Sequence, residues 1–395
     1  MRLSWLRTLV LSMIITLCLG AAFLGGYALG GHRGQNAKAQ SFGFDLLYQV
    51  QDLLDREFIG KLPAQQAQVY GAIHGLVGSY NDPYTVFVEP APREVERDEL
   101  RGHFGGIGAY LDRDKAGDMV VAVMRDRPAA KAGIQDGDVL LAVDDTPITA
   151  EMTGEEVIAL IRGEVGTKVK LTLRRPGQAE PFTVEIVRER IETPSVEWRV
   201  PDEAGHIGYI RISRFAENTA EELKAGIAEL QSQGVRKLVL DLRGNGGGLV
   251  DSAVDTTSLF LKDGQVLHEV KRGGQERFYP VKRVQSPAQD WGLVLLVDGG
   301  TASASEILAG ALRDQTRAIL IGEKTYGKGS VQQVHELSDG SSLHVTVARW
   351  LTPNRQQIDS TGLAPDVPIQ ISADDQAAGR DPQLDRALSW LREGK

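Results

Sequence analysis

The fold of this chain is decided by the sequence GLVLLVDGGTASASEILAGALRD, residues 292–314, and its continuation QTRAILIGEKTYGKGSVQQ, residues 315–333. The first half has the pattern of a buried strand, a turn of small residues and an amphipathic helix. The second half has the pattern of another apolar strand that leads into a loop punctuated by glycines. Ser303 falls at the turn and Lys328 falls in the loop.

Strands and helices alternate on both sides of this stretch. Residues 235–242 are almost continuously apolar, which is typical of a strand in a sheet covered on both faces. They lead into the glycine-rich sequence DLRGNGGG at residues 241–248. Helices that cross over a mostly parallel sheet define an α/β domain, which we place at residues 191–372. A C-terminal helical tail follows at residues 373–395.

Ser303 has two interpretations that the local sequence does not separate. Ser303-x-x-Glu306 has the form of a capping box, so the serine could simply begin the helix. A serine at a helix N-terminus is equally well placed to act as a nucleophile, because free N–H groups and the positive end of the helix dipole stabilise developing negative charge. The small residues around it leave room for a substrate carbonyl group.

A nucleophilic serine needs a base. His335 and His344 lie in predicted strands nearby, but no G-x-S-x-G motif surrounds the serine. Lysine can serve as the base when burial lowers its pKa, and Ser-Lys pairs are a known variant of the catalytic triad. Lys328 lies among small residues, Lys324 is its competitor, and for either one an exposed loop lysine is the alternative.

Composition and motifs exclude several other classes. The formal net charge is −9 and no basic cluster is interleaved with aromatic residues, so nucleic-acid binding is not expected. Gly322-x-x-x-x-Gly327-Lys328 begins like a phosphate-binding loop, but Gly329 stands where that motif needs Ser or Thr. Cys18 is the single cysteine, and no metal-binding spacing such as H-E-x-x-H occurs. We therefore expect no metal and no cofactor.

Residues 101–190 predict a small β-rich module with one short helix. Its order resembles a PDZ domain, and the sequence PAAKAGIQDGDVLLAVDD at residues 128–145 carries most of that resemblance. A PDZ domain captures a peptide C-terminus as an added strand. The expected peptide-binding residues are the glycine loop, whose N–H groups would hold the carboxylate, and the apolar side chains around it. They are Phe104, Gly105, Gly106, Ile107, Gly108, Val157 and Leu160.

The N-terminal 39 residues predict a membrane anchor or a signal segment. Two arginines precede an uncharged run of 24 residues at positions 8–31, and about 20 apolar residues are enough to span a bilayer. An A-x-A sequence at residues 37–39 also permits cleavage after Ala39. Either interpretation places the body of the protein in the cell envelope, on the extracytoplasmic side of the cytoplasmic membrane.

Residues 40–100 predict a helical region. Apolar residues recur there at helical spacing, and prolines lead into the charged run REVERDELR at residues 93–101. We interpret this run as the solvated face of a helix or linker.

Five motifs together resemble the carboxy-terminal processing protease family, also called tail-specific proteases. They are TASASEILAGAL, GEKTYGKGSVQ, DLRGNGGG, DPYT and FGGIG. The resemblance extends from about Phe42 to Ile371. It implies a helical N-terminal region, an inserted PDZ domain and an α/β protease core with a crotonase-like or ClpP-like β-β-α superhelix. The implied function is a serine endopeptidase that captures C-terminal tails of envelope proteins.

The resemblance also assigns roles to residues of this sequence. The nucleophile is Ser303 rather than Ser305, the general base is Lys328, and Gln332 matches the glutamine that orients the lysine. The oxyanion hole would use the N–H groups of Ala304 and Gly248. Gly247 is a second candidate for that hole. Separately, Arg162, just after the PDZ helix, is a candidate for coupling the PDZ domain to the protease core, and a solvated helix end is the alternative.

Two other interpretations remain open on the sequence. A catalytically silent PDZ-containing scaffold would bind peptides without cleaving them, and an acyl-CoA-type hydratase would use a similar α/β superhelix but would not need the PDZ unit. For the protease we expect protein or peptide substrates with exposed apolar C-termini and membrane contact through the N-terminal segment. A homo-oligomer or an adaptor is a further possible partner.

Overall fold

In the computed structural model of this protein, residues 43–394 are described. The chain divides into two compact units, Met1–Ala72 and Ile73–Lys395. The predicted anchor or signal segment lies outside the described residues. Among the helices at residues 43–394, none combines the length and the apolar character needed to cross a membrane.

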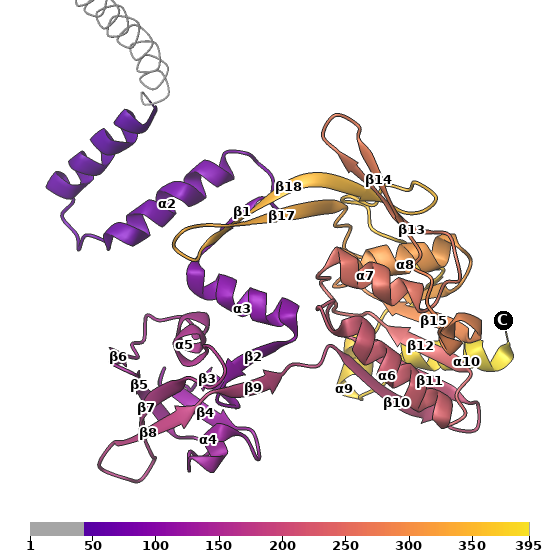
Figure 1. Ribbon diagram of the computed structural model, residues 1–395, viewed down its shortest axis with the longest axis horizontal. Helices are drawn as coiled ribbons and strands as arrows, with labels where there is room; N and C mark the ends of the chain where they lie inside the picture. The colour runs from indigo at the N-terminus through magenta and orange to yellow at the C-terminus, as the bar shows by residue number, and fades with distance from the viewer. Residues whose placement is uncertain (1–42, 395) are drawn as a thin grey trace, which may run out of the picture. The chain divides into compact units, whose positions relative to one another are not determined.

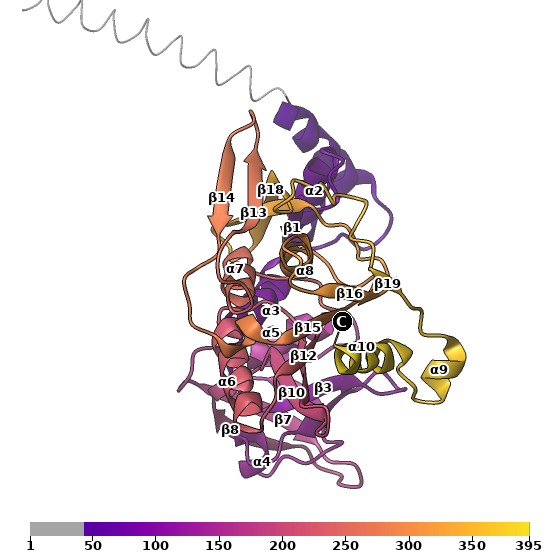
Figure 2. The same cartoon turned by 90° about the vertical axis from the view of Figure 1, so that its right-hand side faces the viewer.

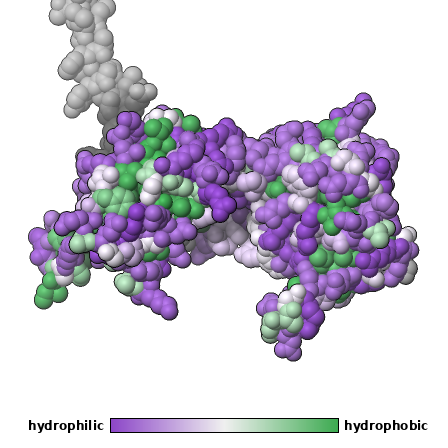
Figure 3. Space-filling view, turned by 90° about the horizontal axis from the view of Figure 1, so that it is seen from below, coloured by the Kyte–Doolittle hydropathy of each residue, from purple (hydrophilic) through white to green (hydrophobic). Residues whose placement is uncertain are grey.

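The described part of the first unit is helical. Residues 43–57 form one helix, and α2 (Gln65–Gly78) continues into the second unit. Many large hydrophobic side chains of this segment are exposed, among them Phe44, Tyr48 and Ile59. The three clusters of buried apolar residues lie in the second unit. The face drawn in Figure 3 is mostly hydrophilic, with hydrophobic residues in separate patches.

Residues 103–192 contain the β-rich module. Five antiparallel strands form a sheet in the order β3-β4-β5-β7-β8, and β6 adds to β5 while β2 pairs with β9. The apolar sides of these strands pack on α5, which begins with the predicted capping box between Thr153 and Glu156. The elements are β2 (His103–Gly106), β3 (Ala109–Arg113), β4 (Met119–Val123), α4 (Pro128–Lys131), β5 (Val139–Val143), β6 (Thr146–Pro147), α5 (Gly154–Ile161), β7 (Lys168–Arg174), β8 (Phe182–Val187) and β9 (Glu189–Glu192).

A six-stranded sheet forms the centre of the core, in the order β10-β11-β12-β15-β16-β19. All its pairings are parallel except the one between β10 and β11, so the predicted α/β arrangement is confirmed. The strands are β10 (Val196–Asp202), β11 (Ile207–Ile212), β12 (Lys237–Asp241), β15 (Gly292–Val297), β16 (Ile319–Gly322) and β19 (Val367–Pro368).

Helices cover both faces of this sheet, as Figure 2 shows. Leu238 and Leu240 of β12 face the cluster built with α6, α7 and α8, whereas Val239 between them faces the cluster built with α10. This alternation follows from the two-residue period of a strand and explains why Leu238, Val239 and Leu240 are all apolar. The helices are α6 (Thr219–Ser232), α7 (Val250–Ser258), η1 (Pro287–Asp290), α8 (Ala304–Asp314), α9 (Ala373–Ala377) and α10 (Pro382–Glu393).

A second, antiparallel sheet has the order β1-β18-β13-β14, with β17 also paired to β18. Figure 1 shows β17 and β18 running side by side away from β1 and α3 (Pro90–Arg101). This sheet joins segments far apart in sequence and was not predicted. Its strands are β1 (Val86–Val88), β13 (Gln265–Lys271), β14 (Glu276–Pro280), β17 (Ser330–Glu336) and β18 (Ser342–Leu351).

Two sequence-based expectations about helices are wrong. The helix after Ser303 was expected to be amphipathic, yet every residue from Ala304 to Leu312 is buried, because α7, β13 and β16 all pack against α8. The charged run in α3 was expected to be solvated, yet Arg93 and Asp98 are buried. Both acquire partners from distant parts of the chain, as described below.

Candidate active site

Three loops meet at one edge of the parallel sheet. They follow the adjacent strands β12, β15 and β16, so their starting points lie side by side at the carboxyl ends of those strands. Hydrogen bonds join them: Ala302 N–H donates to the Asn245 carbonyl at 3.0 Å, and Tyr326 N–H donates to the Thr301 carbonyl at 3.0 Å. Ser303, Lys328 and the glycines of DLRGNGGG are thereby brought to one region.

Ser303 has a backbone conformation that a simple helix cap does not require. Its φ is 53° and its ψ is −116°, outside the regions that L-residues ordinarily occupy. An N-cap serine normally has extended backbone angles. Such strain persists only where the surrounding structure enforces it, and it is concentrated at functional sites. The half-buried Ser303 therefore has the geometry expected of a presented nucleophile.

Glu306 joins the Ser303 turn to the Lys328 loop. Its side chain is fully buried, and its Oε2 atom accepts hydrogen bonds from the backbone N–H groups of Ser303 and Lys328, each at 2.9 Å. Its Oε1 atom accepts from the Gly327 N–H at 2.8 Å and from the Thr325 hydroxyl at 2.5 Å. Four donors compensate the buried carboxylate. The sequence predicts only the capping role of Glu306, because the second loop is about 20 residues away.

Lys328 is half-buried, whereas its competitor Lys324 is exposed. Burial lowers the pKa of the Lys328 amine below its ordinary value, although the negative charges of Glu96 and Asp82 raise it in part. The amine nitrogen lies 5.0 Å from the ring centroid of Tyr84. Burial favours the neutral amine that a base requires, so the structure favours Lys328 over Lys324, a choice that the local sequence alone left open.

Gln332 lies in β17, four residues after Lys328. Its amide nitrogen donates to the Ser330 hydroxyl at 2.8 Å and to the Thr346 hydroxyl at 3.3 Å. Within residues 43–394, no hydrogen bond joins Gln332 to Lys328. The lysine-orienting role expected for this glutamine therefore stays a prediction.

The glycine loop lies directly against the serine. Gly247 has φ of 108°, and a Cβ atom added there would be 2.8 Å from Ser303 Cβ and 3.0 Å from Ala304 N. Its own N–H donates to the Asn245 side-chain oxygen at 2.9 Å. In the described part of the chain, neither the Gly248 N–H nor the Ala304 N–H donates a hydrogen bond. These two groups are thus better candidates than Gly247 for binding an oxyanion.

Asn245 was not singled out from the sequence, although it lies in the quoted glycine-rich motif. It is fully buried, and its side-chain amide donates to the Ile212 carbonyl at 2.8 Å. Its backbone carbonyl accepts from Ala302 N–H and, at 2.9 Å, from the Ser305 hydroxyl. Asn245 therefore holds the glycine loop against the serine turn.

In the β-rich module, the predicted peptide-binding residues have two kinds of environment. Ile107 and Val157 are buried in the core of the module, whereas Leu160 is only partly buried. Phe104 lies under the guanidinium group of Arg162, 3.9 Å from the ring centroid. Gly105 and Gly106 are the last residues of β2, where they pair with Arg190 and Glu189 of β9, and only Gly108 lies between β2 and β3, so the predicted glycine loop is partly strand. Because β3 is an edge strand of its sheet and contacts α5, a peptide strand could be added beside it.

Arg162 is not a solvated helix end. Its guanidinium forms an ion pair with Asp98 of α3 at 3.1 Å, and both side chains are largely buried. Arg93, three positions from the start of α3, forms an ion pair with Glu336, the last residue of β17. The distance between the charged groups is 2.5 Å. One helix therefore contacts both the β-rich module and the strand that follows the Lys328 loop.

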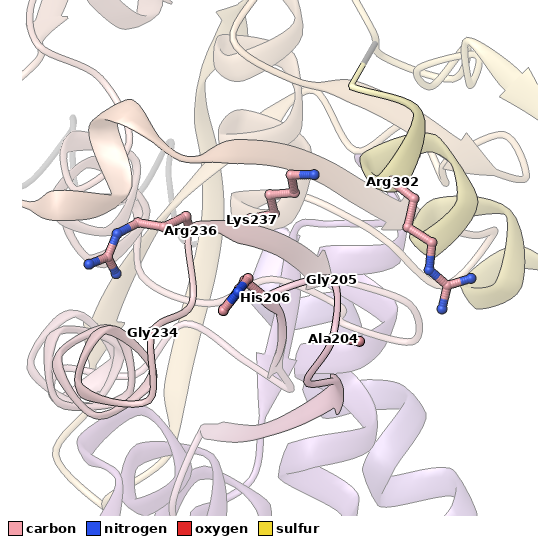
Figure 4. Close-up of a pocket in the computed structure, with 7 residues that line it drawn as sticks. All are labelled: Ala204, Gly205, His206, Gly234, Arg236, Lys237 and Arg392. Atoms are coloured by element: carbon pink, nitrogen blue, oxygen red, sulfur yellow. The ribbon is translucent and has the colours of Figure 1, made fainter.

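A cavity of about 460 Å³ has a different location. It lies where β11 and β12 begin, at the opposite edge of the parallel sheet. Figure 4 shows that its cationic side chains do not converge: Arg236 and Arg392 point to opposite sides. Lys237 donates to the Leu391 carbonyl, and Arg392 is paired with Asp202. The cavity therefore lacks the arrangement of a binding site.

Comparison with known proteins agrees with this architecture. A PDZ domain model matches residues 119–175, and the model of peptidase family S41 matches residues 206–369. The chain is 36% identical over 332 residues to the carboxy-terminal processing protease CtpA of Bacillus subtilis, covering 83% of this chain and 69% of that one. It is 34% identical over 327 residues to the carboxy-terminal-processing protease of Bartonella bacilliformis, covering 82% and 74%.

Other relatives are matched over less of their length. The chain is 38% identical over 299 residues to a probable CtpA-like serine protease of Staphylococcus haemolyticus, covering 75% of this chain and 59% of that one. It spans 59% to 66% of the length of the four staphylococcal relatives first matched.

Among solved structures, a photosystem II D1 C-terminal processing protease is 33% identical to this chain, with a TM-score of 0.47. The match covers 84% of this chain and 88% of that one.

A PDZ domain joined to a peptidase domain of family S41 is the class of protein that the fold and these matches define. Within that class, the chain belongs to the carboxy-terminal processing protease family. The resemblance drawn from the five sequence motifs is thus confirmed.

Proposed function

We propose that this protein is a serine endopeptidase in which Ser303 is the nucleophile and Lys328 is the general base. One observation supports this most directly. The same carboxylate oxygen of Glu306 accepts hydrogen bonds from the backbone N–H of the strained Ser303 and from the backbone N–H of the half-buried Lys328. A structural cap would need neither the strain nor the second loop.

The proposed reaction follows the chemistry of Ser-Lys pairs. The neutral amine of Lys328 accepts the hydroxyl proton of Ser303 while the serine oxygen attacks the scissile carbonyl carbon. The N–H groups of Gly248 and Ala304 stabilise the resulting oxyanion. The C–N bond then breaks, and the Lys328 ammonium protonates the leaving amine. Water, deprotonated by Lys328, hydrolyses the acyl-enzyme and regenerates Ser303.

The PDZ module gives the proposed substrate class. The edge strand β3 and the glycine residues before it offer backbone groups to an extended peptide and its terminal carboxylate. We therefore infer that the substrates are proteins or peptides with exposed apolar C-terminal tails. The N-terminal run of residues 8–31 supports a location on the extracytoplasmic side of the cytoplasmic membrane.

Arg162 is our candidate for coupling peptide capture to catalysis. It contacts Phe104 beside the glycine loop and Asp98 on α3, and α3 reaches β17 through Arg93. A peptide that displaces Phe104 would disturb both contacts. We propose that coupling follows this path. It is tested by measuring how cleavage depends on the tail sequence of the substrate.

The central experiment measures cleavage of an unfolded protein such as casein by the full-length chain. Ser303→Ala and Lys328→Ala should each lower kcat by about 10⁴-fold or more, because the members of such a pair act as a unit. Lys324→Ala, an exposed lysine in the same loop, is the matched control and should retain activity. Full activity of either dyad variant would exclude the proposed dyad. Tail binding without cleavage by the wild type would favour the silent scaffold.

A further inference from the structure

Tyr84 belongs to the motif DPYT, which precedes β1, more than 200 residues before Ser303. The loop that carries it is held in place from both sides. The Asp82 carboxylate accepts from the Tyr84 N–H at 3.2 Å and from the Thr85 hydroxyl at 2.6 Å. The Thr85 hydroxyl oxygen in turn accepts from the Thr346 N–H of β18 at 3.1 Å. The tyrosine is therefore fixed on the same sheet that carries Gln332.

The Tyr84 ring contacts the proposed base. The Lys328 amine nitrogen lies 5.0 Å from the ring centroid, within the range of a cation–π interaction. In the described residues no hydrogen bond to this amine is formed, and the ring face is its close aromatic contact. Burial, together with the neighbouring Tyr326, raises the pKa of Tyr84 to about 12. The phenol is thus neutral, and the ring acts through its face.

We infer that Tyr84 is a positioning residue that sets the proton affinity of Lys328 through the face of its ring. The face of an aromatic ring attracts an ammonium group but not a neutral amine. It therefore stabilises the protonated lysine, in opposition to burial, which favours the neutral form. The balance determines the pH at which the base becomes available. This inference rests on the proposed function of Lys328.

The other titratable groups facing the amine come from three elements. Asp82 lies in the Tyr84 loop, Glu96 lies on α3, and both carboxylates favour the ammonium form of Lys328. His344 lies on β18, and burial lowers its pKa, although Glu96 raises it in part. At neutral pH His344 therefore adds little positive charge. A substitution of Tyr84 leaves all three groups in place.

Two substitutions separate the ring from the hydroxyl group. Tyr84→Phe keeps the ring and removes the hydroxyl, whereas Tyr84→Leu keeps an apolar cover and removes the ring. The measurement is kcat/KM of the full-length enzyme against pH. Because Lys328 must be neutral to act, activity rises with pH through its pKa. Tyr84→Leu should move this rise to lower pH by about 0.5 to 1.5 units, and Tyr84→Phe should leave it within about 0.3 units of the wild type.

Contrary results are specific. An unchanged or upward-shifted profile in Tyr84→Leu would overturn the inference, and so would an equal shift in both variants, which would assign the effect to the hydroxyl. Absence of cleavage by the wild type would instead refute the proposed function. Should Tyr84→Leu be inactive, competitive acylation of Lys328 against pH, read by mass spectrometry in the Ser303→Ala background, reports the same pKa without catalysis. In that experiment the rise in acylation should again move to lower pH in Tyr84→Leu only. Thermal unfolding checks that the variants are folded.

Discussion

At the scale of single residues, the roles proposed for Ser303 and Lys328 rest on backbone strain and on burial. The local sequence left Ser303 open between a cap and a nucleophile, and its positive φ, which no sequence pattern encodes, supports the nucleophile. Lys328 differs from Lys324 in its burial and in its contacts with Tyr84 and Glu306, which the local sequence does not show. Glu306 was visible as a capping residue, yet its contact with Lys328 requires the folded loop.

The glycine loop provides a sharp test at this scale. Gly247→Ala would place a methyl group 2.8 Å from Ser303 Cβ on a backbone with φ of 108°. Displacement of the serine by about 1 Å is enough to lower kcat/KM by about 10²-fold. Gly246→Ala is the matched control, because a Cβ atom at Gly246 meets nothing within 4 Å. Peptide hydrolysis by the two variants gives the comparison, and equal activities would show that Gly247 does not support the serine.

At the scale of secondary-structure elements, the strands and helices of the core could be predicted closely because their apolar runs are long. The β-rich module was also foreseen, down to the Thr153–Glu156 capping box. The second sheet was not, since β1 and β18 pair across more than 250 residues and neither carries a local signal of its partner. Helix α3 shows the same limit: its charges look solvated until Arg162 and Glu336 are placed against them.

The ion pair between Asp98 and Arg162 gives a prediction about α3. Asp98→Ala leaves the guanidinium of Arg162 buried without its partner, which should lower the free energy of unfolding by about 3–5 kcal/mol. It should also reduce the difference in kcat/KM between preferred and poor tail peptides if α3 couples the PDZ module to the core. Urea unfolding and a panel of tail peptides measure the two effects.

The control for Asp98→Ala lies on the same helix. Arg101→Ala removes an exposed charge, and surface substitutions of this kind usually change stability by less than about 0.5 kcal/mol. The coupling proposal fails if Asp98→Ala loses stability but discriminates among tails as the wild type does. Unchanged stability of Asp98→Ala would show that the Asp98–Arg162 pair contributes little to the free energy of unfolding.

At the scale of the whole molecule, parts from the entire second unit build one site. The loop of Tyr84 precedes the PDZ module, the serine and lysine follow it, and α10 near the C-terminus closes the far face of the sheet. Arg243, at the start of the glycine loop, pairs with Asp241 and also with Asp381 at the beginning of α10. Sequence motifs could mark these parts, but only the fold shows that the last helix and the glycine loop share an ion pair.

If the PDZ module delivers tails to this site, cleavage must depend on the α-carboxylate of the substrate. Two peptides of identical sequence, one with a free C-terminus and one amidated, differ only in that charge. Hydrogen bonds from backbone N–H groups to a charged group contribute about 1.5–3 kcal/mol, so amidation should lower kcat/KM by about 10- to 150-fold. A short peptide that spans only the scissile bond serves as the control, because it does not reach the module and its cleavage should be insensitive to amidation. Equal cleavage of both long peptides would remove carboxylate capture from the mechanism while leaving the Ser303–Lys328 assignment intact.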